Sequence, residues 1–184
     1  MATTALIVID MLNPYEHEDA DALAANVEPV VSPLAELIAG VHQSDAEVVY
    51  VNDNYGDFAA RRDDLVERAL GGRRGDLVEP IVPPEGCAFL QKVRHSVFYS
   101  TALEYLLRQR EVTSLILAGQ VTEQCILYSA LDAYVRHFSV CVPADAVAPI
   151  DRGLGDAALE MMRRNMRAEI VATSDLLGGL SPRP

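Results

Sequence analysis

Short apolar runs alternate with segments of helical periodicity along this chain. The runs at 4–10, 47–52 and 114–118 are nearly continuous in apolar residues, which is typical of strands buried on both faces of a parallel sheet. The segments between such runs carry apolar residues at spacings of three and four, which favours amphipathic helices. This alternation predicts an α/β protein with a mostly parallel, doubly wound sheet and helices on both faces.

The pattern also predicts where individual elements lie. Strands are expected at 4–10, 47–52, 87–92, 114–118, 138–142 and 169–172, and helices at 32–42, 61–70, 101–110, 122–136 and 156–166, with one last turn at 173–175. Pro29 and Pro33 are unfavourable inside a helix, so the first helix is expected to begin near Ser32. The proline-rich stretch 76–86 indicates an extended surface connection, and Gly119 is expected to end the fourth strand.

Composition narrows the class of protein. The chain has 184 residues, of which 50% are hydrophobic and 23% charged, and this suits one globular domain spanning 1–184. A formal net charge of −12 argues against nucleic-acid binding, which needs clustered lysine and arginine. No apolar run has the length of a membrane span, and the N-terminus does not resemble a signal peptide. Three cysteines do not form a disulfide framework, so a cytoplasmic location is expected.

Cys125 follows a predicted strand and lies about one turn into a predicted helix. Thr122 suits the N-cap of that helix, and Glu123 suits its first turn. The positive end of a helix favours a thiolate, and its free N–H groups can hold an oxyanion, so Cys125 is a candidate nucleophile. The alternative is a small apolar residue buried in the core, which is the commoner role of a free cysteine.

Two more reactive residues fall at strand ends. Asp10 closes the first strand and Lys92 the third. In doubly wound sheets, ligands bind beyond the carboxyl ends of the strands, so Asp10, Lys92 and Cys125 are expected to share one rim. There the acid can accept the proton of the thiol, and the ammonium can favour the thiolate. The alternatives are a turn acid for Asp10 and a solvated strand end for Lys92.

Three spaced motifs carry a resemblance to a known family. They are the segment 6–11 around Asp10, Lys92 with Ser96 and Phe98 after it, and the segment 119–125 that ends in Cys125. With these motifs the chain resembles the isochorismatase-like cysteine hydrolases, which include nicotinamidases, N-carbamoylsarcosine amidohydrolases and ureidoacrylate hydrolases. The resemblance implies a three-layer α/β/α sandwich with a six-stranded, mostly parallel, Rossmann-like sheet.

The resemblance also implies a chemistry. Asp10, Lys92 and Cys125 would form the catalytic triad of a hydrolase that cleaves a C–N bond of an amide, lactam or ureido compound through a Cys125 thioester. A non-proline cis peptide is expected at Val121–Thr122, where backbone N–H groups of Thr122 and Cys125 would form an oxyanion hole. The alternatives are an isochorismatase-type vinyl-ether hydrolase, which does not need the cysteine, and a non-catalytic binding module on the same fold.

Cofactors and partners follow from smaller signals. The nicotinamidase branch binds a metal with an Asp-x-His element, but the corresponding segment 53–55 has no histidine, so no metal and no cofactor is predicted. A small-molecule amide is the expected partner, together with a second copy of the chain in a dimer or tetramer, through a helix bearing Tyr128, Leu131 and Tyr134. The side chains expected to contact the substrate lie in loops near the triad: Asn13, Tyr15, Asn54, Tyr55, His95 and Phe98.

Overall fold

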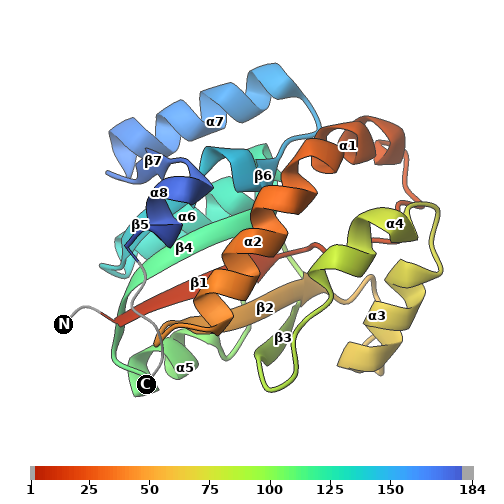
Figure 1. Cartoon of the computed structure of the whole chain (residues 1–184), viewed down its shortest axis with the longest axis horizontal. Helices are drawn as coiled ribbons and strands as arrows, with labels where there is room; N and C mark the ends of the chain where they lie inside the picture. Colours follow the sequence, from red (N-terminus) through yellow and green to blue (C-terminus); the bar gives the residue numbers. More distant parts are fainter. Residues whose placement is uncertain (1–2, 180–184) are drawn as a thin grey trace.

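A single parallel sheet organises the chain in the computed structural model, which describes residues 3–179 (Figure 1). Its order is β3-β2-β1-β4-β5-β7, and the short β6 pairs with β4. The strands are β1 (Thr3–Ile9), β2 (Glu47–Asp53), β3 (Ala88–Lys92), β4 (Val112–Gln120), β5 (Ser139–Pro143), β6 (Val147–Ala148) and β7 (Glu169–Val171). All the pairings are parallel, which confirms the predicted fold class.

Helices cover both faces of the sheet. They are α1 (Ala20–Val27), α2 (Val31–His42), α3 (Arg62–Leu70), α4 (Gly75–Val78), α5 (Leu103–Gln109), α6 (Leu127–Val135), α7 (Arg152–Asn165) and α8 (Thr173–Leu177). In Figure 1, α1 and α2 lie in front of the sheet, while α5 and α6 lie behind it. Two hydrophobic cores result, because alternate residues of β1 point to opposite faces: Leu6 and Val8 to the α2 side, Ile7 and Ile9 to the α6 side.

The order of the strands creates a switch point between β1 and β4. The connections from β1 to β2 and from β2 to β3 pass through helices that pack in the core of the α2 side. The connections from β3 to β4 and from β4 to β5 pass through α5 and α6, in the other core. In folds of this kind, ligands bind beyond the carboxyl ends of the strands at such a switch point.

β1 and β4 approach each other closely at this switch point. Gly119 pairs with Ile9 and has a φ of +114°, which disfavours any residue with a side chain. A Cβ at this position would lie 2.2 Å from the carbonyl oxygen of Ile9. The strand nevertheless continues to Gln120, so the expectation that Gly119 ends it is wrong.

Prolines misled two of the expected boundaries. The chain is helical from Ala20 onward, because Pro29 and Pro33 each lie in the first turn of a helical segment, where a missing N–H costs nothing. The stretch 76–86 is not a fully extended connection, since its first part forms α4 and a 3₁₀ turn that buries Ile81.

The stretch Ala20–His42 is long and apolar enough to cross a membrane by length and composition. The apolar residues of α1 and α2 pack instead into the core on one face of the sheet, among them Leu23, Leu34 and Leu37. Core helices of globular proteins pass the same length test, so this segment is weak evidence for a membrane span.

Candidate active site

Three predicted side chains meet at the carboxyl edge of the sheet. The Nζ atom of Lys92 lies 2.7 Å from Oδ2 of Asp10 and 3.5 Å from Sγ of Cys125. All three residues are buried, with exposed fractions of 9% for Asp10, 2% for Lys92 and 7% for Cys125. An acid, an ammonium and a thiol that are far apart in sequence therefore form one cluster.

Asp10 is held by backbone groups as well as by the ammonium. It follows β1 with a φ of +54°, and its N–H donates to the carbonyl of Val51 at 3.1 Å. Oδ1 accepts the N–H of Asp53 at 2.8 Å, which leaves Oδ2 for Lys92. The amide of Gln120 donates to the carbonyl of Asp10 at 2.6 Å. These contacts fix the orientation of the carboxylate against the Lys92 ammonium.

Lys92 is the only lysine in the chain, whose other Lys/Arg positions are 14 arginines. It ends β3 opposite Asp53 of β2, and Oδ2 of Asp53 lies 3.8 Å from its Nζ. Two carboxylates thus face one buried ammonium. The alternative for Lys92, a solvated strand end, does not hold, because the side chain is buried.

Cys125 lies in a tight turn between β4 and α6. The turn, Thr122–Ile126, is π-helical, and Val121 rather than Thr122 occupies its N-cap position. The carbonyl of Val121 accepts the N–H groups of Gln124 and Ile126, both at 3.1 Å, on either side of Cys125. The Thr122 hydroxyl does not cap the helix; it is buried and has no hydrogen-bond partner among the described residues.

The charges of the cluster set its protonation. Burial raises the pKa of the Asp10 carboxyl above its ordinary value, and the ammonium and the hydrogen bonds oppose this effect only in part. Burial and the neighbouring carboxylate raise the pKa of the Cys125 thiol well above 9. Burial alone would lower the pKa of Lys92, but Asp10, Cys125 and Asp53 raise it above 10.5. These shifts favour a neutral thiol at Cys125 and an ammonium at Lys92, so the predicted preference for a thiolate is absent.

The cis peptide lies one residue earlier than expected. It joins Gln120 to Val121, not Val121 to Thr122. The bond thus falls between the end of β4 and the turn that carries Cys125.

Comparison with known proteins identifies the family. The family model described as the isochorismatase domain matches residues 4–175. The chain belongs to the isochorismatase family.

Its relatives include both uncharacterised proteins and amidohydrolases. The chain is 32% identical to the uncharacterised isochorismatase family protein YaaI of Bacillus subtilis, over 96% of its own length and 97% of that of YaaI. It is 29% identical to the ureidoacrylate amidohydrolase RutB of Methylorubrum extorquens, with 78% and 69% of the chains covered. Its structure resembles that of N-carbamoylsarcosine amidase from Thermoplasma acidophilum, with a TM-score of 0.70 and 29% identity over 93% and 96% of the chains.

Four of the residues expected to bind substrate make hydrogen bonds within the protein, three of them to backbone groups. The amide oxygen of Asn13 accepts the N–H of Tyr15 at 2.7 Å, and the Tyr15 hydroxyl reaches Gln120 at 3.4 Å. The amide oxygen of Asn54 accepts the N–H of Gly56 at 3.0 Å. The Tyr55 hydroxyl donates to the carbonyl of Leu12 at 2.8 Å. These polar groups position the loops beside the triad.

The last two residues expected to contact substrate, His95 and Phe98, differ in their surroundings. Nδ1 of His95 lies 3.8 Å from Sγ of Cys125, and the His95 side chain is exposed. Phe98 instead packs in the core, with its ring 6.0 Å from that of Phe138 and the guanidinium of Arg136 over its face. A packing role therefore accounts for Phe98.

Sequence reasoning missed Gln120, Asn52 and the role of Asp53. Gln120 links the Asp10 carbonyl to Tyr15, and Asn52 exchanges hydrogen bonds with the backbone of Leu12. Both are almost fully buried polar side chains in strands. A polar residue at the end of an otherwise apolar run was the available signal, because buried amides need partners.

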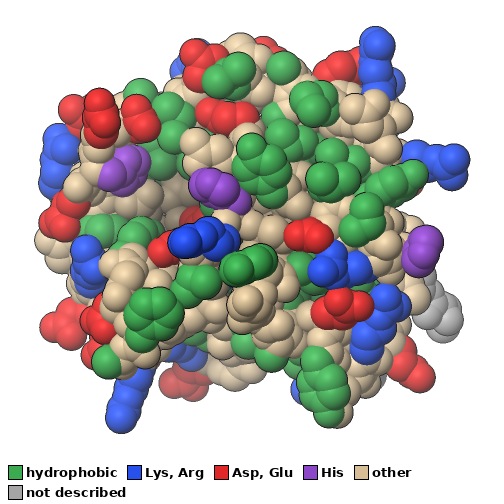
Figure 2. Space-filling view, turned by 180° about the vertical axis from the view of Figure 1, so that it is seen from behind, with side chains coloured by type: hydrophobic (Ala, Val, Ile, Leu, Met, Phe, Trp, Pro, Cys, Tyr) green, Lys and Arg blue, Asp and Glu red, His purple; other side chains and the backbone are tan. Residues whose placement is uncertain are grey.

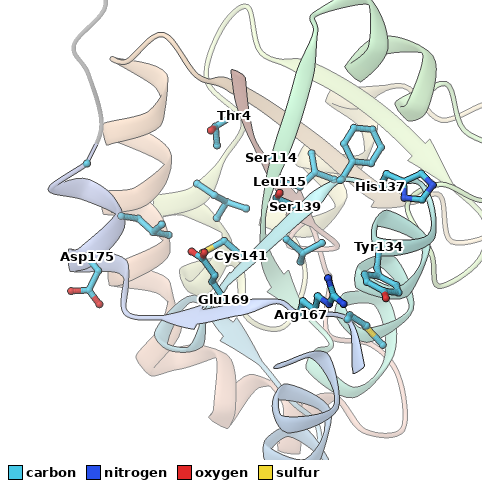
Figure 3. A pocket seen from close by; sticks show the side chains of 16 residues that line it. Thr4, Ser114, Leu115, Tyr134, His137, Ser139, Cys141, Arg167, Glu169 and Asp175 are labelled. Atoms are coloured by element: carbon cyan, nitrogen blue, oxygen red, sulfur yellow. The ribbon is translucent and has the colours of Figure 1, made fainter. Parts of the chain in front are cut away.

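A cavity of about 630 Å³ lies at the other end of the sheet (Figure 3). Its lining includes Thr4, Ser114 and Ser139, which stand near the amino ends of β1, β4 and β5. Cys141 lines it too, whereas none of the triad residues does. The size of this cavity therefore says nothing about the triad, but it makes Cys141 a competing thiol in any labelling experiment.

Proposed function

We propose that the chain is a cysteine-dependent hydrolase that cleaves a C–N bond of a small amide, lactam or ureido compound through a Cys125 thioester. The observation that carries this proposal is the position of the Lys92 ammonium, in contact with both the Asp10 carboxylate and the Cys125 sulfur. Amidohydrolases among its relatives support it, including the ureidoacrylate enzyme.

In the first half of the reaction, Asp10 takes the proton of the Cys125 thiol. The Lys92 ammonium contacts both groups, so they lie in one cluster, and a raised pKa makes Asp10 a stronger base than an exposed aspartate. The resulting thiolate attacks the amide carbonyl. Lys92 stabilises that negative charge, and Asp10 then returns the proton to the leaving nitrogen.

The backbone around Cys125 supplies the oxyanion hole in this proposal. The N–H of Cys125 and that of a neighbour, Val121 or Thr122, would donate to the carbonyl oxygen as it becomes negative. Fixed donors of this kind do not have to reorient during the reaction, and losing one typically costs about 10²–10³ in rate.

A panel of small amides with intact-mass detection tests the proposal. The panel begins with ureidoacrylate and N-carbamoylsarcosine, and includes nicotinamide, which is expected to be poor because Tyr55 stands in place of a metal-binding histidine. The enzyme carries Cys87→Ser and Cys141→Ser, so that Cys125 is the only thiol. We expect turnover and a Cys125 acyl adduct, both lost in Cys125→Ala. Turnover that survives Cys125→Ala would refute covalent catalysis.

We also propose that the protein is a homo-oligomer through α6 and α7. Large apolar side chains are exposed there: Tyr128, Leu131, Tyr134 and Val135 on α6, and Leu154 and Met161 on α7. Figure 2 shows hydrophobic side chains gathered on this side of the molecule. Light scattering after gel filtration should give a dimer or tetramer that Leu131→Glu dissociates, while Phe58→Glu on an exposed loop leaves it intact. A monomeric parent protein would refute this.

A further inference from the structure

The Cys125 sulfur is close to two chemically different groups. One is the buried ion pair of Asp10 and Lys92, whose Nζ lies 3.5 Å from Sγ. The other is His95, with its Nδ1 atom 3.8 Å from Sγ and its side chain exposed to solvent. The sulfur is therefore within reach of a buried ion pair and of an imidazole that water can reach.

The position of His95 is set by its surroundings. Its ring lies against that of Tyr128 on α6, with 5.4 Å between the centroids and a tilt of 37°. Two residues further along, the N–H of Val97 donates to the hydroxyl of Ser129 at 3.1 Å, which ties the loop after β3 to the same helix. The ring thus packs beside α6 while its side chain stays exposed.

The proposed function requires a water molecule to attack the Cys125 thioester. That water arrives from solvent, and the carbon that it attacks is bonded to Sγ, beside His95. Asp10 is buried beside Lys92, whereas the His95 ring is exposed to the solvent that supplies this water. We propose that His95 is the general base of thioester hydrolysis, and that Asp10 serves only the formation of the thioester.

The step balances without any further reagent. His95 takes one proton from the water as its oxygen bonds to the acyl carbon, and the carbonyl electron pair moves to the oxyanion. The C–S bond then breaks, and its electrons return to Sγ. The His95 imidazolium gives its proton to the thiolate, so that the products are a carboxylic acid and the original thiol.

Chemical rescue tests this proposal with p-nitrophenyl acetate as the probe, because nitrophenolate release reports acylation and the steady state reports deacylation. In His95→Ala we expect a burst of one equivalent, then a steady rate lower by about 10²-fold or more, as for the loss of a general base. The acetylated enzyme should accumulate, and added imidazole should restore the steady rate because the vacated position is open to solvent. His42→Ala on α2 is the matched control and should behave like the parent.

The other possible results would refute either the proposed function or the role of His95. If the parent releases nitrophenolate no faster than Cys125→Ser does, the proposed function fails. If the parent acylates but His95→Ala keeps the parental steady rate, Asp10 is the base and the role of His95 is refuted. A burst slowed as much as the steady rate would place His95 in acylation, which also refutes it. His95→Gln, which keeps a polar planar side chain but no base, should match His95→Ala without rescue and guards against misfolding.

Discussion

Removing the buried ammonium of Lys92 should destabilise the fold, because the Asp10 carboxylate would then lack its partner. Replacing Lys92 by methionine keeps an unbranched side chain but leaves the Asp10 carboxylate without its partner at 2.7 Å. Removing one member of a buried ion pair typically destabilises a protein by about 3–5 kcal/mol, since the remaining charge is uncompensated. For a chain of this size, that corresponds to a melting temperature lower by about 6–20 °C.

Thermal and urea unfolding measure this change. Arg163→Met is the control, because the Arg163–Glu160 pair is exposed and should contribute little. Adding Asp10→Asn to Lys92→Met should recover much of the stability, since the new amide oxygen can still accept the N–H of Asp53. The reasoning is refuted if Lys92→Met lowers the melting temperature no more than Arg163→Met does.

The stability lost in Lys92→Met should also depend on pH in a defined direction. Burial already raises the pKa of Asp10 above 3.8, and loss of the ammonium raises it further. An acid whose pKa is raised by folding weakens the fold as pH increases, because the unfolded chain ionises first. The deficit of Lys92→Met should therefore be small near pH 3.8 and grow as the pH rises through the raised pKa of Asp10.

Three further perturbations address the surroundings of the triad. Thr122→Val removes a buried hydroxyl without a partner in the described chain, so the free energy of unfolding should stay the same or rise by up to about 1 kcal/mol; a clear loss in urea unfolding would contradict this. Folding raises the pKa of the Cys125 thiol above 9.0, so the parent should lose stability above pH 9 relative to Cys125→Ala, by at most about 1.4 kcal/mol per pH unit; parallel stability curves would argue against it. Gly119→Ala forces a Cβ against the Ile9 carbonyl and should lower the melting temperature far more than Gly56→Ala, where φ is also positive but nothing lies within 4 Å.

The approach of Asp10, Lys92 and Cys125 could be predicted because the carboxyl ends of parallel strands lie at one edge of the sheet. Apolar runs buried on both faces indicate parallel strands, and parallel strands end at one edge of the sheet. Asp10 and Lys92 end such runs, and Cys125 follows another, so their approach needed no knowledge of side-chain packing.

Contacts that depend on side-chain packing could not be predicted from the sequence pattern. The N–H of Asp53, on β2, donates to the carboxylate of Asp10 at the end of the neighbouring β1. The side-chain amide of Gln120, on β4, donates to the carbonyl of Asp10. No periodicity encodes such contacts. The expected thiolate at Cys125 failed for a related reason: the argument from the helix end ignored burial and the neighbouring carboxylate, and these dominate the pKa.

Local backbone chemistry explains the misplaced boundaries. Proline was counted as a helix breaker, although at Pro29, Pro33 and Pro80 it lies at the start of a helical turn, where it is tolerated. β6 has only two residues, too few for any alternation to be visible.

Because Lys92 is the only lysine, a single buried amine can be labelled selectively and followed by NMR. Reductive methylation with isotopically labelled formaldehyde would mark only Lys92 and the α-amino group of the chain, since every other basic side chain is arginine or histidine. Because Nζ is enclosed, its resonance would arise only in molecules that have opened enough to admit the reagent. The rate at which that signal grows would measure how often the centre of the molecule is uncovered, before any substrate is known.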